Sequence, residues 1–167
     1  MKISTQPLFI KSDIKKWLIW NSKDLKIENY KYSYWTNNGA ESLAKICQII
    51  TKLNNKRIRI LIPNYYCGQT LRYLRGINIE IIFYSLDKFF LPNYDLLKSK
   101  FNDKNIDIFL HVHYFGNIIN SKKSKEFAKS KNAILIEDCA HLISPHIYDK
   151  FLGDFLIFSP HKHFAVP

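Results

Sequence analysis

Hydrophobic residues follow two alternating patterns from about residue 40 to the end of the chain. In some segments apolar residues recur every three or four positions, the spacing of a helix with one buried face. Between these segments lie short, nearly continuous apolar runs, which are typical of strands buried on both faces. We expect helices over residues 40–53, 71–74, 94–101 and 121–130, and strands over residues 58–62, 79–84, 108–112, 133–136 and 155–158.

This alternation predicts an α/β fold, a mostly parallel sheet with helices on both faces. Right-handed crossovers are the default connection between such strands. In open sheets of this kind, ligands bind beyond the carboxyl ends of the strands. That rule selects four segments, in which unusual polar residues also gather: 63–68, 111–116, 137–141 and 159–163.

The composition is that of a single globular domain. The chain has 167 residues, of which 47% are hydrophobic, enough for one sizeable core. Its three cysteines, Cys47, Cys67 and Cys139, are too widely spaced for a disulfide framework or a paired metal site, which favours a reducing compartment. The N-terminus lacks the features of a secretory signal, and no apolar run is long enough to span a membrane. We therefore expect a cytoplasmic protein with no membrane partner.

Basic residues outnumber acidic ones, with 25 Lys and Arg against 14 Asp and Glu and a formal net charge of +11. Such a balance suits nucleic acid or an anionic membrane surface. The basic residues are scattered, however, and the densest stretch, at 122–125, falls on a solvated face of a predicted helix. An anionic small ligand such as a phosphate ester suits the same charge. We expect no nucleic-acid partner, and a basic nucleic-acid-binding domain is the most remote hypothesis.

A serine and a lysine stand three residues apart directly after the last predicted strand, at Ser159 and Lys162. A lysine in this place is costly to desolvate unless it has a use, and burial or attachment to an aldehyde would provide one. One alternative is an ordinary surface lysine. Another is the Ser-x-x-Lys nucleophile of serine β-lactamases and penicillin-binding proteins, which also needs Ser-Asp-Asn and Lys-Thr-Gly elements downstream.

An acidic pair, Glu137 and Asp138, directly follows the apolar run at 133–136, and His141 lies close behind. A carboxylate at the carboxyl end of a strand can pair with a cationic ring nitrogen, bind a metal or act as a base. Asp138 can equally cap the next helix.

His111 and His113 alternate along a predicted strand, so their side chains point to the same face. His-x-His is a metal-ligand spacing, and with Asp138 it would suggest a metallohydrolase. Further ligands at a recognisable spacing are not evident. The alternative is one packed histidine and one hydrogen-bonded histidine, and we expect no metal.

Turn residues followed by Gly39 and Ala40 open the first predicted helix. The N–H groups in the first turn of a helix lack helical partners, so they form an anion site. Many helices begin in this way, but the other candidate segments also suit a phosphate ligand.

Taken together, these segments resemble the DegT/DnrJ/EryC1/StrS family of sugar aminotransferases, which depend on pyridoxal 5'-phosphate (PLP). The resemblance runs from about Trp35 to the C-terminus and depends on matches that share the family's order and spacing. They are the helix opening at Gly39 and Ala40; the strand that ends in Pro63; Phe83 to Asp87, like the family's strand that ends in Asp; Val112 to Gly116, like Val-His-x-x-Gly; Ile136 to His141, like Glu-Asp-x-Ala-Gln/His; and Gly153-Asp154 followed by Phe158, Ser159 and Lys162, like the cofactor-lysine segment.

The resemblance implies a role for each matched residue. Lys162 would hold PLP as a Schiff base and later move a proton between substrate and cofactor. Asp138 would pair with the pyridine nitrogen and keep it protonated. His141 would lie near the phenolic oxygen of the ring, while the Gly39 and Ala40 amides and the Ser159 hydroxyl would hold the phosphate. His113 is expected to give structural support.

The sequence departs from the family's pattern in two places. The family often has an aromatic residue that stacks on the ring after the segment at Pro63, whereas the register here places Cys67 there, with Tyr66 beside it. Either of these two is the expected ring contact. The family's lysine usually follows its serine by five residues, whereas here the interval is three, a spacing known in other PLP enzymes of the same fold.

The resemblance implies the large domain of a PLP-dependent transferase, aspartate aminotransferase-like and of fold type I. We expect an N-terminal segment over residues 1–34 and a PLP-binding large domain over 35–167, truncated and without the small C-terminal domain. The expected activity is transfer of an amino group, from glutamate, to a keto-sugar nucleotide in glycan or polysaccharide biosynthesis, by a homodimer. The alternative is a truncated, inactive or regulatory relative.

Overall fold

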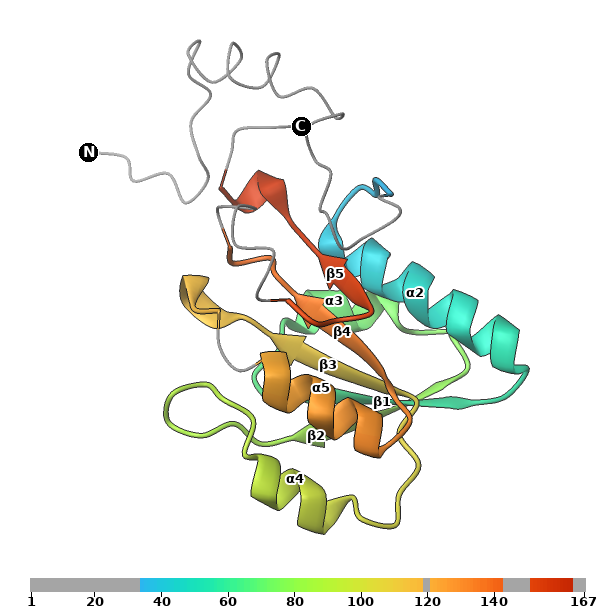
Figure 1. Cartoon of the computed structure of the whole chain (residues 1–167). Helices are drawn as coiled ribbons and strands as arrows, with labels where there is room; N and C mark the ends of the chain where they lie inside the picture. Colours follow the sequence, from blue (N-terminus) through green and yellow to red (C-terminus); the bar gives the residue numbers. More distant parts are fainter. Residues whose placement is uncertain (1–33, 119–120, 143–150, 164–167) are drawn as a thin grey trace, which may run out of the picture.

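Five parallel strands form one sheet in the order β2-β1-β3-β4-β5 (Figure 1). The computed structural model describes residues 34–118, 121–142 and 151–163. The strands are β1 (Ile58–Pro63), β2 (Ile79–Tyr84), β3 (Ile108–Val112), β4 (Ile134–Asp138) and β5 (Phe155–Ile157). The order reverses between β1 and β3, and a reversal of this kind in a parallel sheet marks the place where ligands bind.

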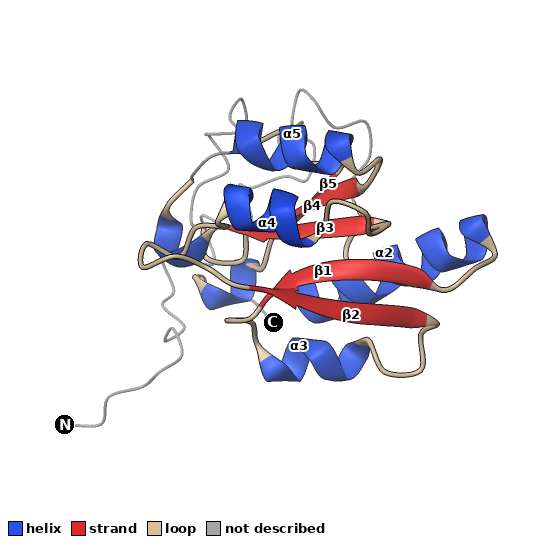
Figure 2. Cartoon of the chain, turned by 90° about the horizontal axis from the view of Figure 1, so that it is seen from below, coloured by secondary structure: helices blue, strands red, loops and turns tan. Residues whose placement is uncertain are grey.

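Helices cover both faces of this sheet, as the sequence predicts (Figure 2). Helices α2 and α3 pack on one face, which we call the front, and helices α4 and α5 pack on the other, the back. The helices are α2 (Gly39–Asn54), α3 (Gly68–Tyr73), α4 (Tyr94–Lys100) and α5 (Ser121–Ser130), with short 3-10 turns η1 (Tyr114–Gly116) and η3 (Pro160–Lys162). The predicted α/β class is therefore confirmed.

Helix α2 has a polar start and a left-handed end that its sequence explains. The side chain of Asn38 accepts a hydrogen bond from the backbone N–H of Glu41, so it caps the first turn. Glu41 also forms an ion pair with Lys45, one turn further along. The helix stops at Asn55, which has a φ of 46°, a conformation that asparagine tolerates better than most residues.

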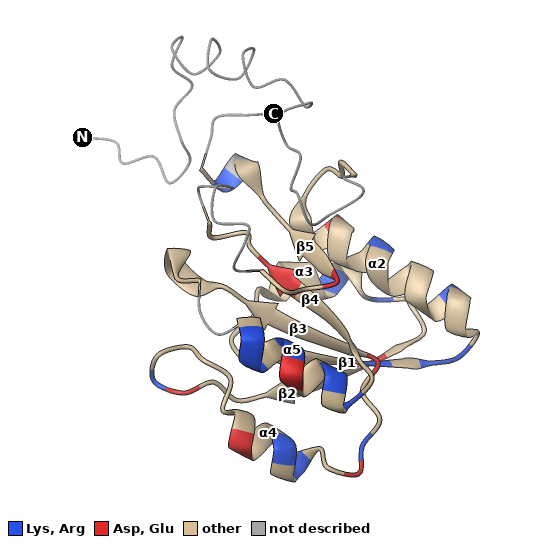
Figure 3. Cartoon of the chain, in the orientation of Figure 1, with Lys and Arg blue, Asp and Glu red and all other residues tan. Residues whose placement is uncertain are grey.

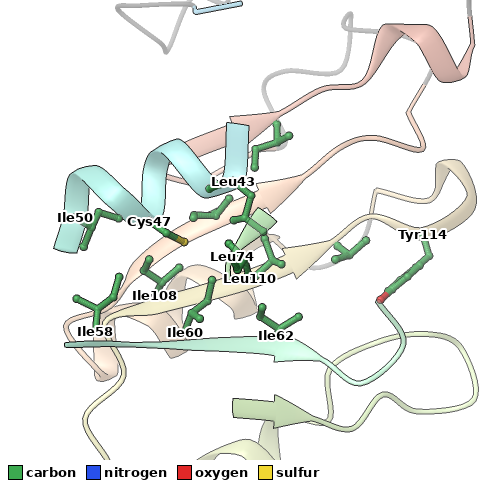
Figure 4. Close-up of a cluster of buried hydrophobic side chains, with 14 residues drawn as sticks. Leu43, Cys47, Ile50, Ile58, Ile60, Ile62, Leu74, Ile108, Leu110 and Tyr114 are labelled. Atoms are coloured by element: carbon green, nitrogen blue, oxygen red, sulfur yellow. The ribbon is translucent and has the colours of Figure 1, made fainter. Parts of the chain in front are cut away.

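Alternate strand residues divide the core into a front cluster and a back cluster. Ile58, Ile60 and Ile62 of β1 point toward α2, where they meet apolar side chains such as Leu43 (Figure 4). Leu61, between them, points to the back and packs with residues of α4 and α5. Both clusters contain residues with no exposed surface, so the sheet is buried on both faces.

Two elements differ from the sequence-based expectation by more than one residue at an end. Strand β4 extends to Asp138 rather than ending at residue 136, because Glu137 and Asp138 pair with β3 on one side and β5 on the other. Helix α3 begins at Gly68, three residues earlier than expected, since its first turn contains no buried residue that apolar spacing could reveal. The predicted boundary between an N-terminal segment (1–34) and the large domain (35–167) coincides with the first described residue. This boundary therefore stays a prediction. Within the described ranges, no helix is long and apolar enough to cross a membrane.

Candidate active site

The predicted site residues come together at the carboxyl edge of the sheet, on its front. Tyr66 follows β1, Asp138 ends β4, and Ser159 follows β5. Two close approaches connect these segments: the phenol of Tyr66 contacts Asp138, and the backbone of Gly39 in α2 lies against Ser159. The rule that ligands bind beyond strand ends therefore selected segments that meet in space.

Asp138 is a buried carboxylate with acceptor capacity to spare. Its Oδ2 accepts a hydrogen bond of 2.8 Å from the hydroxyl of Tyr66, and its Oδ1 accepts one of 2.9 Å from the backbone N–H of Ala140. Burial, and then the neighbouring Asp138, raises the pKa of Tyr66 well above its ordinary value, so the phenol stays a donor. A carboxylate has about four acceptor positions. These two described bonds leave room for a further donor on Asp138.

The first turn of α2 lies close to the start of η3. A Cβ added to Gly39 would stand 3.2 Å from Cγ2 of Ile157 and 3.8 Å from Oγ of Ser159. A side chain here would crowd the strand end, so glycine lets the helix N-terminus approach Ser159. Gly39, Ala40 and the buried Ser159 are thus neighbours, as a phosphate-binding group requires.

Lys162 is the last residue of η3, and its backbone N–H donates to the carbonyl of Ser159 at 3.0 Å. Its charge reaches two other site residues. Burial, and then the charge of Lys162, lowers the pKa of His141; hydrogen bonds from the backbone of Thr70, with Lys162 adding to them, lower the pKa of Cys67. The side chain of Lys162 is exposed, in the turn that follows β5. Its role as the cofactor lysine stays a prediction.

Tyr66 and Cys67 take different places in the site. The phenol of Tyr66 points to Asp138, whereas Cys67 is exposed and precedes the first residue of α3. Which of them contacts the ring of a cofactor stays a prediction.

His111 and His113 point to the back of the sheet, away from Asp138. Their rings lie 4.7 Å apart, which confirms that they share a face. His111 shares a hydrogen bond with Ser124 of α5, and His113 forms one of 2.5 Å with Glu137. Across the described ranges, no group of three or more His, Cys, Asp and Glu side chains could hold a metal ion. His113 therefore has the contacts of a structural residue.

Sequence reasoning missed a cluster of aromatic rings beside the site. Tyr65, Phe90, Tyr114 and Phe115 contact one another with centroid distances of 5.1 to 5.9 Å. Phe115 also stacks on His141 at 5.8 Å. Phe90 and Phe115 have φ values of 60° and 54°, rare for bulky residues. These rings come from three separate loops, so no local pattern reveals the cluster.

A family model agrees with this architecture along most of the chain. The model of the DegT/DnrJ/EryC1/StrS aminotransferase family matches residues 29–166. The chain belongs to this family. The resemblance inferred from the sequence is thereby confirmed. No curated protein matches the chain by sequence.

Solved structures share the fold of this family member. They include the SepCysS–SepCysE N-terminal domain complex (TM-score 0.65, 19% identity, 92% of this chain and 43% of that one). An E. coli GDP-4-keto-6-deoxy-D-mannose-3-dehydratase with bound hydrated PLP matches with a TM-score of 0.62 and 18% identity, over 79% of this chain and 34% of that one. An aminotransferase from Psychrobacter cryohalolentis matches with a TM-score of 0.62 and 16% identity, over 84% and 40%.

These structures confirm the predicted fold class, the large domain of PLP-dependent transferases of fold type I. The predicted cofactor agrees with the family and with the PLP bound in the E. coli neighbour. The chain spans less than half the length of each of these structures.

Acidic and basic residues share three of the described helices. Acidic residues lie at the end of β4 and also accompany the lysines of α2, α4 and α5 (Figure 3). Within these elements, basic residues therefore do not form an uninterrupted stripe.

Proposed function

We propose that this chain forms the PLP-binding part of an aminotransferase, with Lys162 as the lysine that binds the cofactor. The observation that supports this most directly is the state of Asp138. Its buried carboxylate is held by Tyr66 and Ala140, yet keeps room for another donor at the carboxyl edge of the sheet. A protonated ring nitrogen is such a donor. The close approach of Gly39 to Ser159 supports a phosphate-binding role for these two residues.

Each residue would have a defined task around that cofactor. PLP, when bound, supplies an electron sink for a bond broken at the substrate carbon. Asp138 would hold a proton on the ring nitrogen, and Tyr66 would orient Asp138 by its hydrogen bond. The Gly39 and Ala40 amides and the Ser159 hydroxyl would bind the phosphate. His141, with its lowered pKa, would stay neutral near the ring's phenolic oxygen.

Lys162 would have two tasks in succession. Its exposed position leaves the amine accessible to PLP and to a substrate. The Lys162 amine would also act as a base, taking a proton from the substrate carbon. Cys67 or Tyr66 would border the ring.

The finer features of the proposal follow from the family. The amino donor would be glutamate, and the acceptor a keto-sugar nucleotide used for a glycan or polysaccharide. The enzyme would act in the cytoplasm as a homodimer. The E. coli neighbour is named for a keto-sugar nucleotide, which supports this substrate class. Size-exclusion chromatography with light scattering would test the dimer.

Covalent trapping tests the central part of the proposal. The protein is incubated with PLP and reduced with borohydride, and peptides are then mapped by mass spectrometry. We expect one pyridoxyl group on Lys162, and its loss in Lys162→Ala but not in Lys123→Ala, a matched lysine on the surface of α5. A label spread over several lysines, or absent, would contradict the assignment.

A further inference from the structure

The side chain of Glu137 lies on the back of the sheet, behind the proposed site. Successive strand residues point to opposite faces, so Asp138 points to the front while Glu137 points toward α5. Glu137 has no exposed surface. It does not face the cofactor site, and the proposed chemistry gives it no task.

Four donors surround this one carboxylate. Its Oε2 accepts hydrogen bonds from the Ser121 hydroxyl at 2.7 Å and from Nε2 of His113 at 2.5 Å. Its Oε1 accepts backbone N–H groups from Leu152 at 2.7 Å and Gly153 at 2.5 Å. Burial alone would raise the pKa of Glu137, but the hydrogen bonds, first those from His113 and Ser121, hold it below its ordinary value. The group is therefore an ionised carboxylate with its acceptor capacity filled.

His113 is arranged to donate to this carboxylate. Its Nδ1 is buried and has no hydrogen-bond partner among the described residues, while its ring lies against the rings of His111 and Phe151. Because an ionised carboxylate only accepts hydrogen bonds, Nε2 of His113 is the donor to Oε2 of Glu137. His113 thus holds Glu137 from the end of β3.

Gly153 lies so close to Glu137 that no side chain fits there. A Cβ at Gly153 would stand 2.9 Å from Cγ of Glu137 and 2.9 Å from the carbonyl oxygen of Phe155. Both distances are shorter than real Cβ contacts. Only glycine at residue 153 therefore lets the backbone pack directly against the Glu137 side chain.

Residues 152 and 153 lie shortly before β5, separated from it by Asp154, whose backbone N–H donates to the carbonyl of Leu135 at 2.8 Å. Strand β5 starts at Phe155, and its register places Ile157 opposite Asp138. The carbonyl of Ile157 then accepts the N–H of Cys139 at 2.8 Å. Ser159 comes two residues later, and Lys162 ends the turn that follows. A displacement at residue 153 would pass along this short strand to the phosphate-binding and lysine positions.

We propose that Glu137 is a positioning residue: by holding the backbone of Leu152 and Gly153, it sets the place of Ser159 and Lys162 relative to Asp138. This inference rests on the proposed function of that site. Glu137 contacts no cofactor itself. His113 and Ser121 hold its carboxylate in the orientation that the backbone N–H groups require.

PLP titration of the purified chain, followed by absorbance, tests this with Glu137→Gln. Glutamine has the same shape and keeps one carbonyl oxygen. Its NH2 group, however, replaces an oxygen that accepts from two donors, so donor would face donor. We expect PLP to bind at least tenfold more weakly. Ser121→Ala, which removes one donor of four, should weaken it in the same direction by a smaller factor.

The matched control is Asp107→Asn at the amino end of β3. Asp107 also holds backbone, accepting the N–H of Arg59 at 2.7 Å, and it pairs with Lys56. It lies at the opposite edge of the sheet from the site. We expect its PLP affinity to stay within twofold of wild type, even if its melting temperature falls as far as that of Glu137→Gln. Equal PLP affinity in Glu137→Gln and wild type would overturn the proposal.

Hydrogen exchange on the cofactor-free chain separates this proposal from the proposed function. In Glu137→Gln, the amides of Cys139 and of residues 152–157 should exchange at least tenfold faster, and in Asp107→Asn they should not. Unchanged exchange there would overturn the positioning role whatever PLP does. If the wild type fails to bind PLP, the proposed function fails, and the exchange rates still decide whether Glu137 holds β5.

Discussion

Glu137 and Asp138 are adjacent carboxylates with opposite surroundings. Glu137 points to the back of the sheet and accepts four hydrogen bonds from four different residues. Asp138 points to the front and, from the described residues, accepts two, from Tyr66 and Ala140. Both are buried. Burial alone therefore does not distinguish a structural carboxylate from one that is open to a ligand, whereas the number of donors around it does.

The difference between the two faces extends beyond this pair. On the back, His113 and Ser121 hold Glu137 among side chains with almost no exposed surface. Toward the front, Tyr66 contacts Asp138, and the next residue, Cys67, is exposed, as is Lys162. Among the described residues at this edge of the sheet, the back is thus a sealed side and the front an accessible side.

Alanine in place of each carboxylate should separate the two roles in stability. Glu137→Ala leaves four donors without their acceptor, so we expect the free energy of unfolding to fall by about 4 kcal/mol. Asp138→Ala leaves two, and should cost about half as much or less. Urea unfolding followed by circular dichroism measures both. An equal loss in the two variants would contradict the contrast.

Binding should show the reverse order. Asp138→Asn keeps the shape of the side chain but loses the charge that would hold a proton on the ring nitrogen. We expect PLP affinity to fall by about 30-fold or more, corresponding to about 2 kcal/mol. The free energy of unfolding should change less than in Glu137→Ala. Absorbance titration with PLP measures the affinity, and an unchanged dissociation constant would remove Asp138 from the site.

Lower pH should weaken the contribution of Glu137 and leave its glutamine variant less affected. Because the pKa of Glu137 is lower in the folded chain than its ordinary value of 4.5, its ionised form stabilises the fold above that value. This stabilisation is lost as pH falls through the folded pKa. The difference in unfolding free energy between wild type and Glu137→Gln should shrink by up to about 1.4 kcal/mol per pH unit.

Glu41→Gln provides the comparison for that titration. Hydrogen bonding to Lys45, and to the backbone of Asn37, also lowers the pKa of Glu41, but this residue is partly exposed. Added salt should therefore reduce the pH effect at Glu41 and leave that at Glu137 almost unchanged. The same salt sensitivity at both residues would mean that solvent reaches the back of the sheet.

The fold was largely predictable because its signals are local. The bounds of β2, β3 and α5 agree with the sequence-based ranges, since apolar runs at 79–84 and 108–112 and a helical spacing at 121–130 end in polar residues. The end of β4 was missed because acidic residues break the apolar run there. Pairing with β3 and β5 on both sides, which no local pattern contains, extends the strand to Asp138.

The site was predictable only as a set of segments. The rule of strand ends selected the neighbourhoods of Asp138, Ser159 and Tyr66, but not the hydrogen bond between Tyr66 and Asp138. That contact joins residues 72 positions apart in the sequence. The proposed task of Glu137 was also missed. The alternation that turns it away from Asp138 is visible in the sequence, but its donors at residues 121 and 152–153 are distant along the chain. A buried acid one position before a site residue is the signal that could have found it.

The rate of cysteine modification is the smallest expected difference between the sealed and accessible sides. Hydrogen bonds from the backbone of Thr70, and the charge of Lys162, hold the pKa of Cys67 below its ordinary value of 9.0. Burial raises the pKa of Cys47 to about 12 and that of Cys139 well above its ordinary value. A thiol with a pKa of about 12 has about a thousandfold less thiolate at neutral pH than one at 9.0. Iodoacetamide should therefore modify Cys67 alone in the folded chain, as measured by peptide mass spectrometry, and all three cysteines in urea.

PLP should slow the modification of Cys67, since this thiol is expected to border the ring. Lys162→Ala should slow it without PLP by removing the nearby charge. Early labelling of Cys139 would show that the back of the sheet opens more readily than the filled carboxylate of Glu137 implies.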